Sequence, residues 1–226
     1  MHGNPGYDIG HLLAGGVLLM SFALLVQRRI RALIRLYAAQ AVLLAAAAAW
    51  QGSVQHAPEL YVAAAITLAA KGVAIPAALR RIVRRLGPAT ARTGPGPVVV
   101  AGRFTLLAAG VGLVALSALV VLPATALSPV AARENLAMAL AVVLIGLLAM
   151  IVRRTALTQA IGFLALENGL VLAAVGVAGM PLVVELAVAV LVLVAFAVFG
   201  VFFFRIRARF DSLELHHLDR VGEAHR

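Results

Sequence analysis

The stretch that decides the fold runs from Glu134 to Ala178 and reads ENLAMALAVVLIGLLAMIVRRTALTQAIGFLALENGLVLAAVGVA. It contains two long apolar runs, and the charged residues that separate them are Arg153 and Arg154. As a helix, each run is long enough to cross a hydrocarbon core of about 30 Å. This pattern is typical of two membrane-spanning helices joined by a short basic loop.

The same pattern repeats outward along the rest of the chain, so we expect an all-α fold, a polytopic transmembrane helix bundle of about seven spans. Each span holds roughly 18–23 residues, which suits a bilayer. The expected spans cover residues 9–26, 33–50, 59–79, 104–122, 134–152, 157–178 and 182–204. The remaining residues, 205–226, predict an amphipathic cytoplasmic tail that lies on the membrane surface or docks to a partner subunit.

The composition agrees with a membrane protein. The chain has 226 residues, of which 63% are hydrophobic and 12% charged, whereas soluble domains have about 25% charged residues. The formal net charge is +10. Because the arginines stand in short runs between apolar stretches, they read as orientation signals and not as a nucleic-acid surface. The absence of cysteine excludes disulfides and cysteine-ligated iron–sulfur clusters within this chain.

The arginines are distributed unevenly between the two expected sides of the membrane. They follow the first, third, fifth and seventh spans, whereas Arg133 is the only arginine on the opposite side. Positively charged residues stay in the cytoplasm. We therefore expect the N-terminus outside and the C-terminus in the cytoplasm.

Two ionisable residues lie near the middle of expected spans, Lys71 in the third and Glu167 in the sixth. A charge at a helix centre costs about 2.5–3.5 kcal/mol on insertion scales, and such residues often mark proton or ion paths. Lys71 is the only lysine in the chain, and a buried lysine can release a proton, whereas arginine cannot. For Lys71 a proton relay, a structural ion pair and chance retention all remain open.

Four more acidic or polar positions call for an interpretation. Asn168 follows Glu167 directly, and Glu185 lies near the outer edge of the seventh span, so both are further proton-path candidates. Glu59 and Glu134 stand where spans begin, and we interpret them as helix-start acids that the helix dipole favours. The sequence predicts no metal site and no catalytic site.

A stripe of small residues marks the sixth span. Gly162, Gly169 and Gly176 recur every seven residues, which places them on one helix face and predicts close helix packing. Glu167 lies about 150° around the helix from this stripe at about 100° per residue. We therefore expect the glycines to face one neighbouring helix and Glu167 to face another.

The stretch Arg153–Gly169, RRTALTQAIGFLALENG, resembles hydrogenase-4 component E, a membrane subunit of group-4 NiFe hydrogenase and formate hydrogenlyase-type complexes. Further matches along nearly the whole chain are Leu36–Gln40, Lys71 with Pro76, and residues 210–213 with Leu218. The last three spans also look like subunit K of complex I. Two departures stand out, since the subunit-K glutamate would fall nearer Leu164, and no acidic residue lies near Leu191.

The resemblance implies a structural membrane subunit, non-catalytic itself, that contributes to proton translocation in a redox-driven complex of the prokaryotic cell (plasma) membrane. Its partners would be antiporter-like membrane subunits, a membrane anchor subunit and a soluble hydrogenase or oxidoreductase arm. The NiFe and iron–sulfur centres would lie in these partner subunits, with no cofactor in this chain. A stand-alone secondary transporter and a purely structural membrane scaffold are the alternatives.

Overall fold

Helices make up the regular structure in the computed structural model, which describes residues 5–86, 102–153 and 155–176. The elements are α1 (Pro5–Val26), α2 (Ile30–Gln55), α3 (Pro58–Thr67), the π-helix η1 (Leu68–Ala74), α4 (Ile75–Leu86), α5 (Arg103–Ala124), α6 (Val130–Ile151) and α7 (Ala156–Val175). No strand occurs in these ranges. The all-α prediction is therefore confirmed for the described residues.

Six helices in this part of the chain are long and apolar enough to cross a membrane. They are Asp8–Val26, Ile30–Gln55, Pro58–Arg84, Arg103–Ala124, Ala132–Ile151 and Ala156–Val175. The third combines α3, η1 and α4 into one helix. Each of the first six predicted spans overlaps one of these helices, and the last two residues of the sixth, 177–178, lie outside the described residues. The predicted seventh span (182–204), with Glu185, and the predicted tail (205–226) lie outside the described residues.

Several helices extend beyond the apolar runs that predicted them. Helix α2 continues past the expected end of the second span at residue 50 to Gln55, and α4 continues past the expected end of the third span at residue 79 to Leu86. An apolar run marks only the part of a helix that suits lipid. The helix itself can extend beyond this run when the polar residues that follow also favour helical backbone. Arginine is a good helix former, so the arginines that follow the third apolar run extend the helix.

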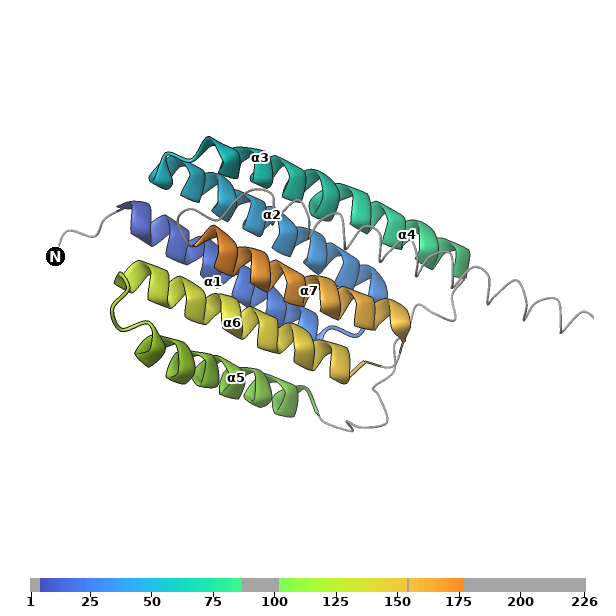
Figure 1. Cartoon of the computed structure of the whole chain (residues 1–226). Helices are drawn as coiled ribbons and strands as arrows, with labels where there is room; N and C mark the ends of the chain where they lie inside the picture. The colour runs from blue at the N-terminus through green and yellow to red at the C-terminus, as the bar shows by residue number, and fades with distance from the viewer. Residues whose placement is uncertain (1–4, 87–101, 154, 177–226) are drawn as a thin grey trace, which may run out of the picture. The chain divides into compact units, whose positions relative to one another are not determined.

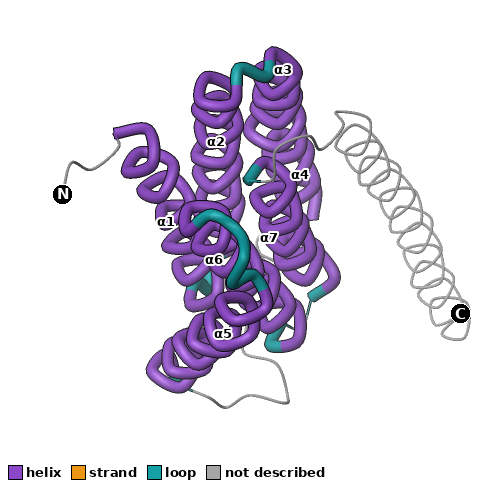
Figure 2. The backbone as a smooth tube through the Cα atoms, turned by 60° about the vertical axis from the view of Figure 1, so that its left-hand side comes forward, coloured by secondary structure: helices purple, strands orange, loops and turns teal. Residues whose placement is uncertain are grey.

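The helices lie side by side, as Figures 1 and 2 show. Helix α6 packs against α5, α1 and α7, while α2 packs against α1, α7 and the helix formed by α3, η1 and α4. The main apolar core lies where α1, α2, α3, α6 and α7 meet. Its buried members are Ala14, Val17, Leu44, Ala47, Ala48, Ala64, Ala139, Val142, Val171, Leu172 and Val175.

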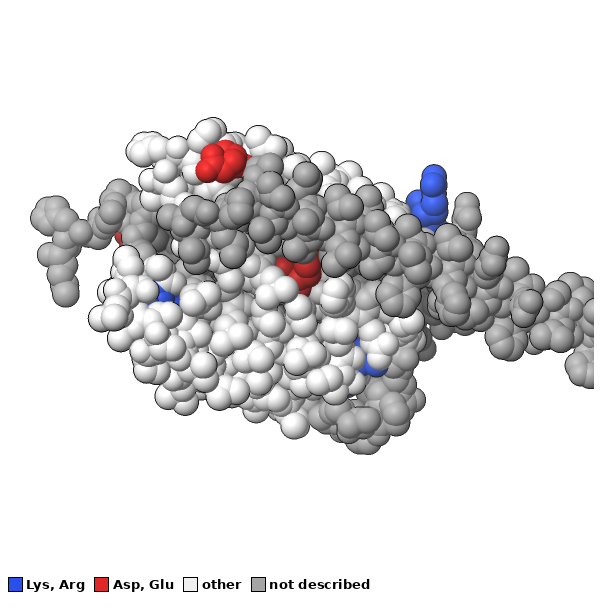
Figure 3. All heavy atoms as spheres, in the orientation of Figure 1, with Lys and Arg blue, Asp and Glu red and all other residues white. Residues whose placement is uncertain are grey.

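Burial and hydropathy run in opposite directions across the six helices. In the apolar stretch of α7, 61% of the residues are buried, the largest share of the six helices, and the mean hydropathy is the lowest, 1.5. In that of α5, only 17% of the residues are buried, and the mean hydropathy is the highest, 2.5. A soluble protein would bury its most apolar helix. Here the most apolar helix is the most exposed, and the face in Figure 3 shows few charged side chains over the described part. A lipid surrounding accounts for this order.

Candidate functional site

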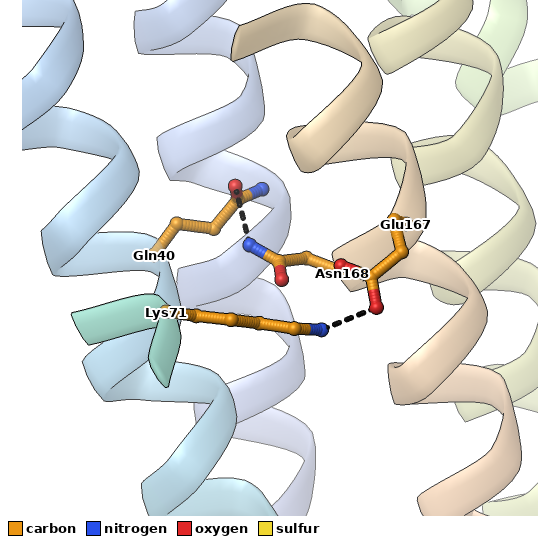
Figure 4. A network of polar contacts seen from close by, with 4 residues as sticks. All are labelled: Gln40, Lys71, Glu167 and Asn168. Atoms are coloured by element: carbon orange, nitrogen blue, oxygen red, sulfur yellow. Dashed lines mark hydrogen bonds and ion pairs between the residues drawn. The ribbon is translucent and has the colours of Figure 1, made fainter. Parts of the chain in front are cut away.

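A buried ion pair joins η1 to α7. Lys71 Nζ donates to Glu167 Oε1 at 2.5 Å, and the two side chains are 4% and 3% exposed. Figure 4 shows the lysine side chain extended toward the carboxyl group. The two residues lie 96 positions apart in the chain. The sequence singled out each residue separately, and the structure brings them together.

The π-helical segment η1 positions Lys71. Its widened turn shows in the N–H of Ile75, which donates to the carbonyl of Ala70, five residues earlier. Pro76 follows at once, and proline has no N–H while its ring collides with the carbonyl four residues before it. A widened turn accommodates such a proline. Single π turns inside α-helices are rare and are found frequently at functional sites.

Helix α7 positions Glu167 through its opposite face. The glycine stripe of α7 lies against α6, and these two helices have the most extensive contact in the described part of the chain. A Cβ on Gly169 would lie 2.8 Å from the Val143 backbone nitrogen, and one on Gly162 would lie 3.0 Å from that of Met150. Gly176 lies against Asn135. With the glycine face held by α6, Glu167 faces η1.

An amide network lies beside the ion pair and reaches α1. Asn168 Nδ2 donates to Gln40 Oε1 at 3.2 Å, and Gln40 Nε2 donates to Ser21 Oγ at 2.7 Å. The Ser21 hydroxyl donates in turn to the Val17 carbonyl at 3.0 Å. Gln40, Asn168 and Ser21 are all at most 1% exposed. The network therefore ties α1, α2 and α7 together deep in the bundle, and Figure 4 shows its Asn168–Gln40 bond.

Gln40 and Ser21 were not predicted as site residues. Gln40 stands inside the expected second span, where a polar side chain in an apolar run is unfavourable unless it finds a partner. The position of Gln40 could therefore have identified it as a site residue from the sequence. Ser21 could not be identified in this way, because the hydroxyl of a serine in a membrane helix can bond to the backbone of its own helix.

Three buried atoms around the pair have no hydrogen-bond partner among the described residues. They are Glu167 Oε2, Asn168 Oδ1 and the hydroxyl of Tyr37. Tyr37 is fully buried on α2, three residues before Gln40. Glu167 thus uses one carboxyl oxygen for Lys71 and keeps the other available.

Arg153 fastens the linker between α6 and α7 to the end of α1. Its Nη2 donates to the Leu24 carbonyl at 2.5 Å and to the Gln27 carbonyl at 3.2 Å. Burial lowers the pKa of Arg153 to about 10, which leaves the guanidinium charged at neutral pH. Arg153 therefore satisfies carbonyls that the end of α1 leaves without helical partners.

A second polar contact lies near the opposite ends of these helices. Glu134 Oε2 is 3.3 Å from His11 Nδ1, beside a pocket of about 210 Å³ that Ser117 and Leu122 also line.

The interpretation of Glu134 as a helix-start acid is wrong, because α6 begins at Val130 and has no acidic residue in its first turn. Glu59, by contrast, does lie in the first turn of α3.

The described residues define a helical protein with six helices suited to a membrane and a buried lysine–glutamate pair between two of them. Over 211 residues the sequence is 35% identical to "Uncharacterized protein Rv0085" of Mycobacterium tuberculosis, a match that covers 93% of this chain and 94% of the relative. The chain belongs to the same family as that mycobacterial protein. No protein-family model and no solved structure matches the chain.

Proposed function

We propose that this chain is an integral membrane subunit of a multisubunit redox-driven complex of the NiFe hydrogenase and complex I kind. It crosses the prokaryotic cell membrane seven times, with its N-terminus outside and its C-terminus in the cytoplasm. Its role is partly structural, and its buried charges take part in proton translocation. The redox centres belong to the partner subunits, in keeping with the lack of cysteine in this chain.

The Lys71–Glu167 pair is the observation that carries this proposal. Replacing a buried ion pair by apolar residues of similar volume is often neutral or stabilising, so stability alone gives little reason to keep one. Inserting each charge into a membrane is also unfavourable. Lys71 Nζ and Glu167 Oε1 lie 2.5 Å apart, and ionisable residues inside membrane helices commonly belong to proton paths. A role in moving protons gives both charges a use inside the bundle.

The arginine-rich helix ends support the proposed orientation. The linker between α1 and α2 carries Arg28 and Arg29, α4 ends with Arg84 nearby, α5 begins at Arg103, and Arg153 precedes α7. Successive helices run in opposite directions, so these ends lie on one side of the bundle (Figure 1). By the positive-inside rule this side faces the cytoplasm.

Purification of the tagged chain from its native membrane in mild detergent tests the assembly. We expect a large complex that contains antiporter-like membrane subunits, a membrane anchor and chains with nickel–iron and iron–sulfur centres. A chain that purifies alone and transports a substrate in vesicles would overturn the proposal and favour a secondary transporter.

The proton role needs a variant that leaves no single buried charge behind. The double substitution Lys71→Met with Glu167→Gln removes both charges at once. In vesicles with the whole complex, we expect electron transfer to continue and proton pumping to fall. Glu59→Gln is the matched control, because this exposed carboxyl lies at the start of α3. Unchanged pumping in the double variant would leave a structural scaffold as the function.

A further inference from the structure

The hydroxyl of Tyr37 has no evident structural purpose. It is fully buried on α2 and has no hydrogen-bond partner among the described residues. Buried polar atoms in proteins nearly always have a partner, and where no protein group serves, the partner is often an ordered water. A phenylalanine would fill the same space without this unsatisfied group. The hydroxyl therefore calls for an explanation.

The position of Tyr37 on α2 points it toward the ion pair. Residues three apart share a helix face, so Tyr37 lies on the same face as Gln40. That face meets α7, because Gln40 bonds to Asn168, the neighbour of Glu167. Tyr37 is therefore on the side of α2 that holds the residue next to Glu167.

Two further buried oxygens at this place lack a partner. Glu167 Oε2 and Asn168 Oδ1 are both acceptors without a donor among the described residues. A buried water typically makes two to four hydrogen bonds to such groups. It can donate to both of these oxygens and accept from a hydroxyl. The set of unsatisfied atoms is therefore complementary to one bound water.

We propose that a bound water joins the Tyr37 hydroxyl to Glu167 Oε2, with Asn168 Oδ1 as a further acceptor, and that Tyr37 relays protons to the Lys71–Glu167 pair. The relay rests on the proposed function, whereas the water bridge does not. The hydroxyl passes its proton to the bridging water, the water passes one of its own to Glu167 Oε2, and the phenol oxygen takes up a replacement from a second, protonated water. Tyr37 and the bridging water therefore end with the proton count and charge they had before.

The position of Tyr37 along α2 also indicates from which side of the bundle protons would reach Glu167. Along α2, Tyr37 lies nearer than Gln40 to the end that carries Arg31 and Arg35. The relay therefore leads from Glu167 toward the arginine-bearing side of the bundle. In the proposed orientation, protons reach the pair from the cytoplasm.

Infrared spectroscopy of the purified full-length protein in lipid tests the bridge. In wild type we expect a water O–H band that shifts in oxygen-18-labelled water, and a Glu167 carboxyl band identified by its loss in Glu167→Gln. Tyr37→Phe should remove the water band and shift the carboxyl band. Tyr61→Phe, on the exposed tyrosine of α3, should change neither. Identical spectra for Tyr37→Phe and wild type would overturn the proposal.

A structure of the wild-type protein that resolves ordered water is an independent check that needs no variant. Water density within hydrogen-bond distance of both the Tyr37 hydroxyl and Glu167 Oε2 supports the bridge, and its absence refutes it. Pumping by the whole complex then tests the relay. If Tyr37→Phe loses the bridge but pumps as wild type does, the relay is wrong. If the chain joins no redox complex, the proposed function fails while the bridge still stands.

Discussion

Helices α7 and α5 are similar in length, yet they have opposite surroundings. Helix α7 is 61% buried, and it carries Glu167, Asn168 and the glycine stripe. Helix α5 is 17% buried, with Phe104 88% exposed and Leu119 74% exposed. The more apolar of the two is the one on the outside. A bilayer makes this arrangement stable, because lipid accepts apolar side chains as readily as a protein core does.

The contrast shows at which positions of such a bundle the choice of side chain is restricted. At the exposed positions of α5 almost any apolar side chain serves, since lipid adapts to its shape. At the buried positions of α7 each side chain meets a fixed protein neighbour, so small size or hydrogen-bonding capacity is required there. Substitutions on α7 should therefore be damaging where matched ones on α5 are tolerated.

The largest effect is expected when one member of the ion pair is removed. Glu167→Gln or Lys71→Met alone leaves a buried charge without its partner, at a cost of about 3–5 kcal/mol. The double variant should recover most of this loss, which a double-mutant cycle on unfolding in detergent measures. Additive losses in the double variant would show that the two charges do not stabilise each other.

Added volume on the glycine stripe should have the next largest effect. A Cβ on Gly169 would lie 2.8 Å from backbone and side-chain atoms of Val143, so Gly169→Ala must separate α7 from α6. We expect a loss of about 1–3 kcal/mol, as for overpacked cores. On α5, Gly112→Ala is the control, because its Cβ would meet nothing within 4 Å. Equal melting temperatures for the two variants would contradict the comparison.

Breaking the amide network should cost less. Gln40→Leu leaves Asn168 Nδ2 and the Ser21 hydroxyl without this partner, and hydrogen bonds between membrane helices are worth about 0.6 kcal/mol on average. We expect a stability loss of about 1 kcal/mol. Ser53→Ala on the same helix should change little, since Ser53 is exposed and bonds within α2. A wild-type melting temperature for Gln40→Leu would show that the network adds no stability.

The smallest effect belongs to α5. Leu119→Ala removes a side chain that is 74% exposed within the chain, so the change in unfolding free energy should stay within about 0.5 kcal/mol. Assembly of the whole complex is a second measurement on the same variant. Normal stability with defective assembly would reveal a partner subunit on this face in place of lipid.

The sequence predicted the helices and the two buried charges well. Lys71 and Glu167 stood out because each interrupts an apolar run that a membrane helix requires. Their pairing could not be predicted, since it depends on how η1 and α7 are placed, and the two residues are 96 positions apart. Tyr37 escaped notice because a tyrosine in an apolar run is ordinary, and only its burial without a partner makes it a candidate.

The π turn and the start of α6 were missed for local reasons. Pro76 signalled a possible break, but a proline in a helix can be accommodated by a kink, a gap or a widened turn, and packing decides between them. Glu134 was placed at a helix start because the apolar run begins there. The helix starts earlier, at Val130, directly after its N-cap residue Pro129. The residues between Val130 and Glu134 are therefore helical although they precede the apolar run.

The amides of Gln40 and Asn168 have one further consequence. A carboxyl, amine or phenol can give up a proton and regain it, but a side-chain amide holds its hydrogens and carries no ionisable site near neutral pH. In the proposed proton path, the Gln40–Asn168 amide pair therefore gives no titratable step from Glu167 toward α1. The proposed path would then have to leave Glu167 on another side.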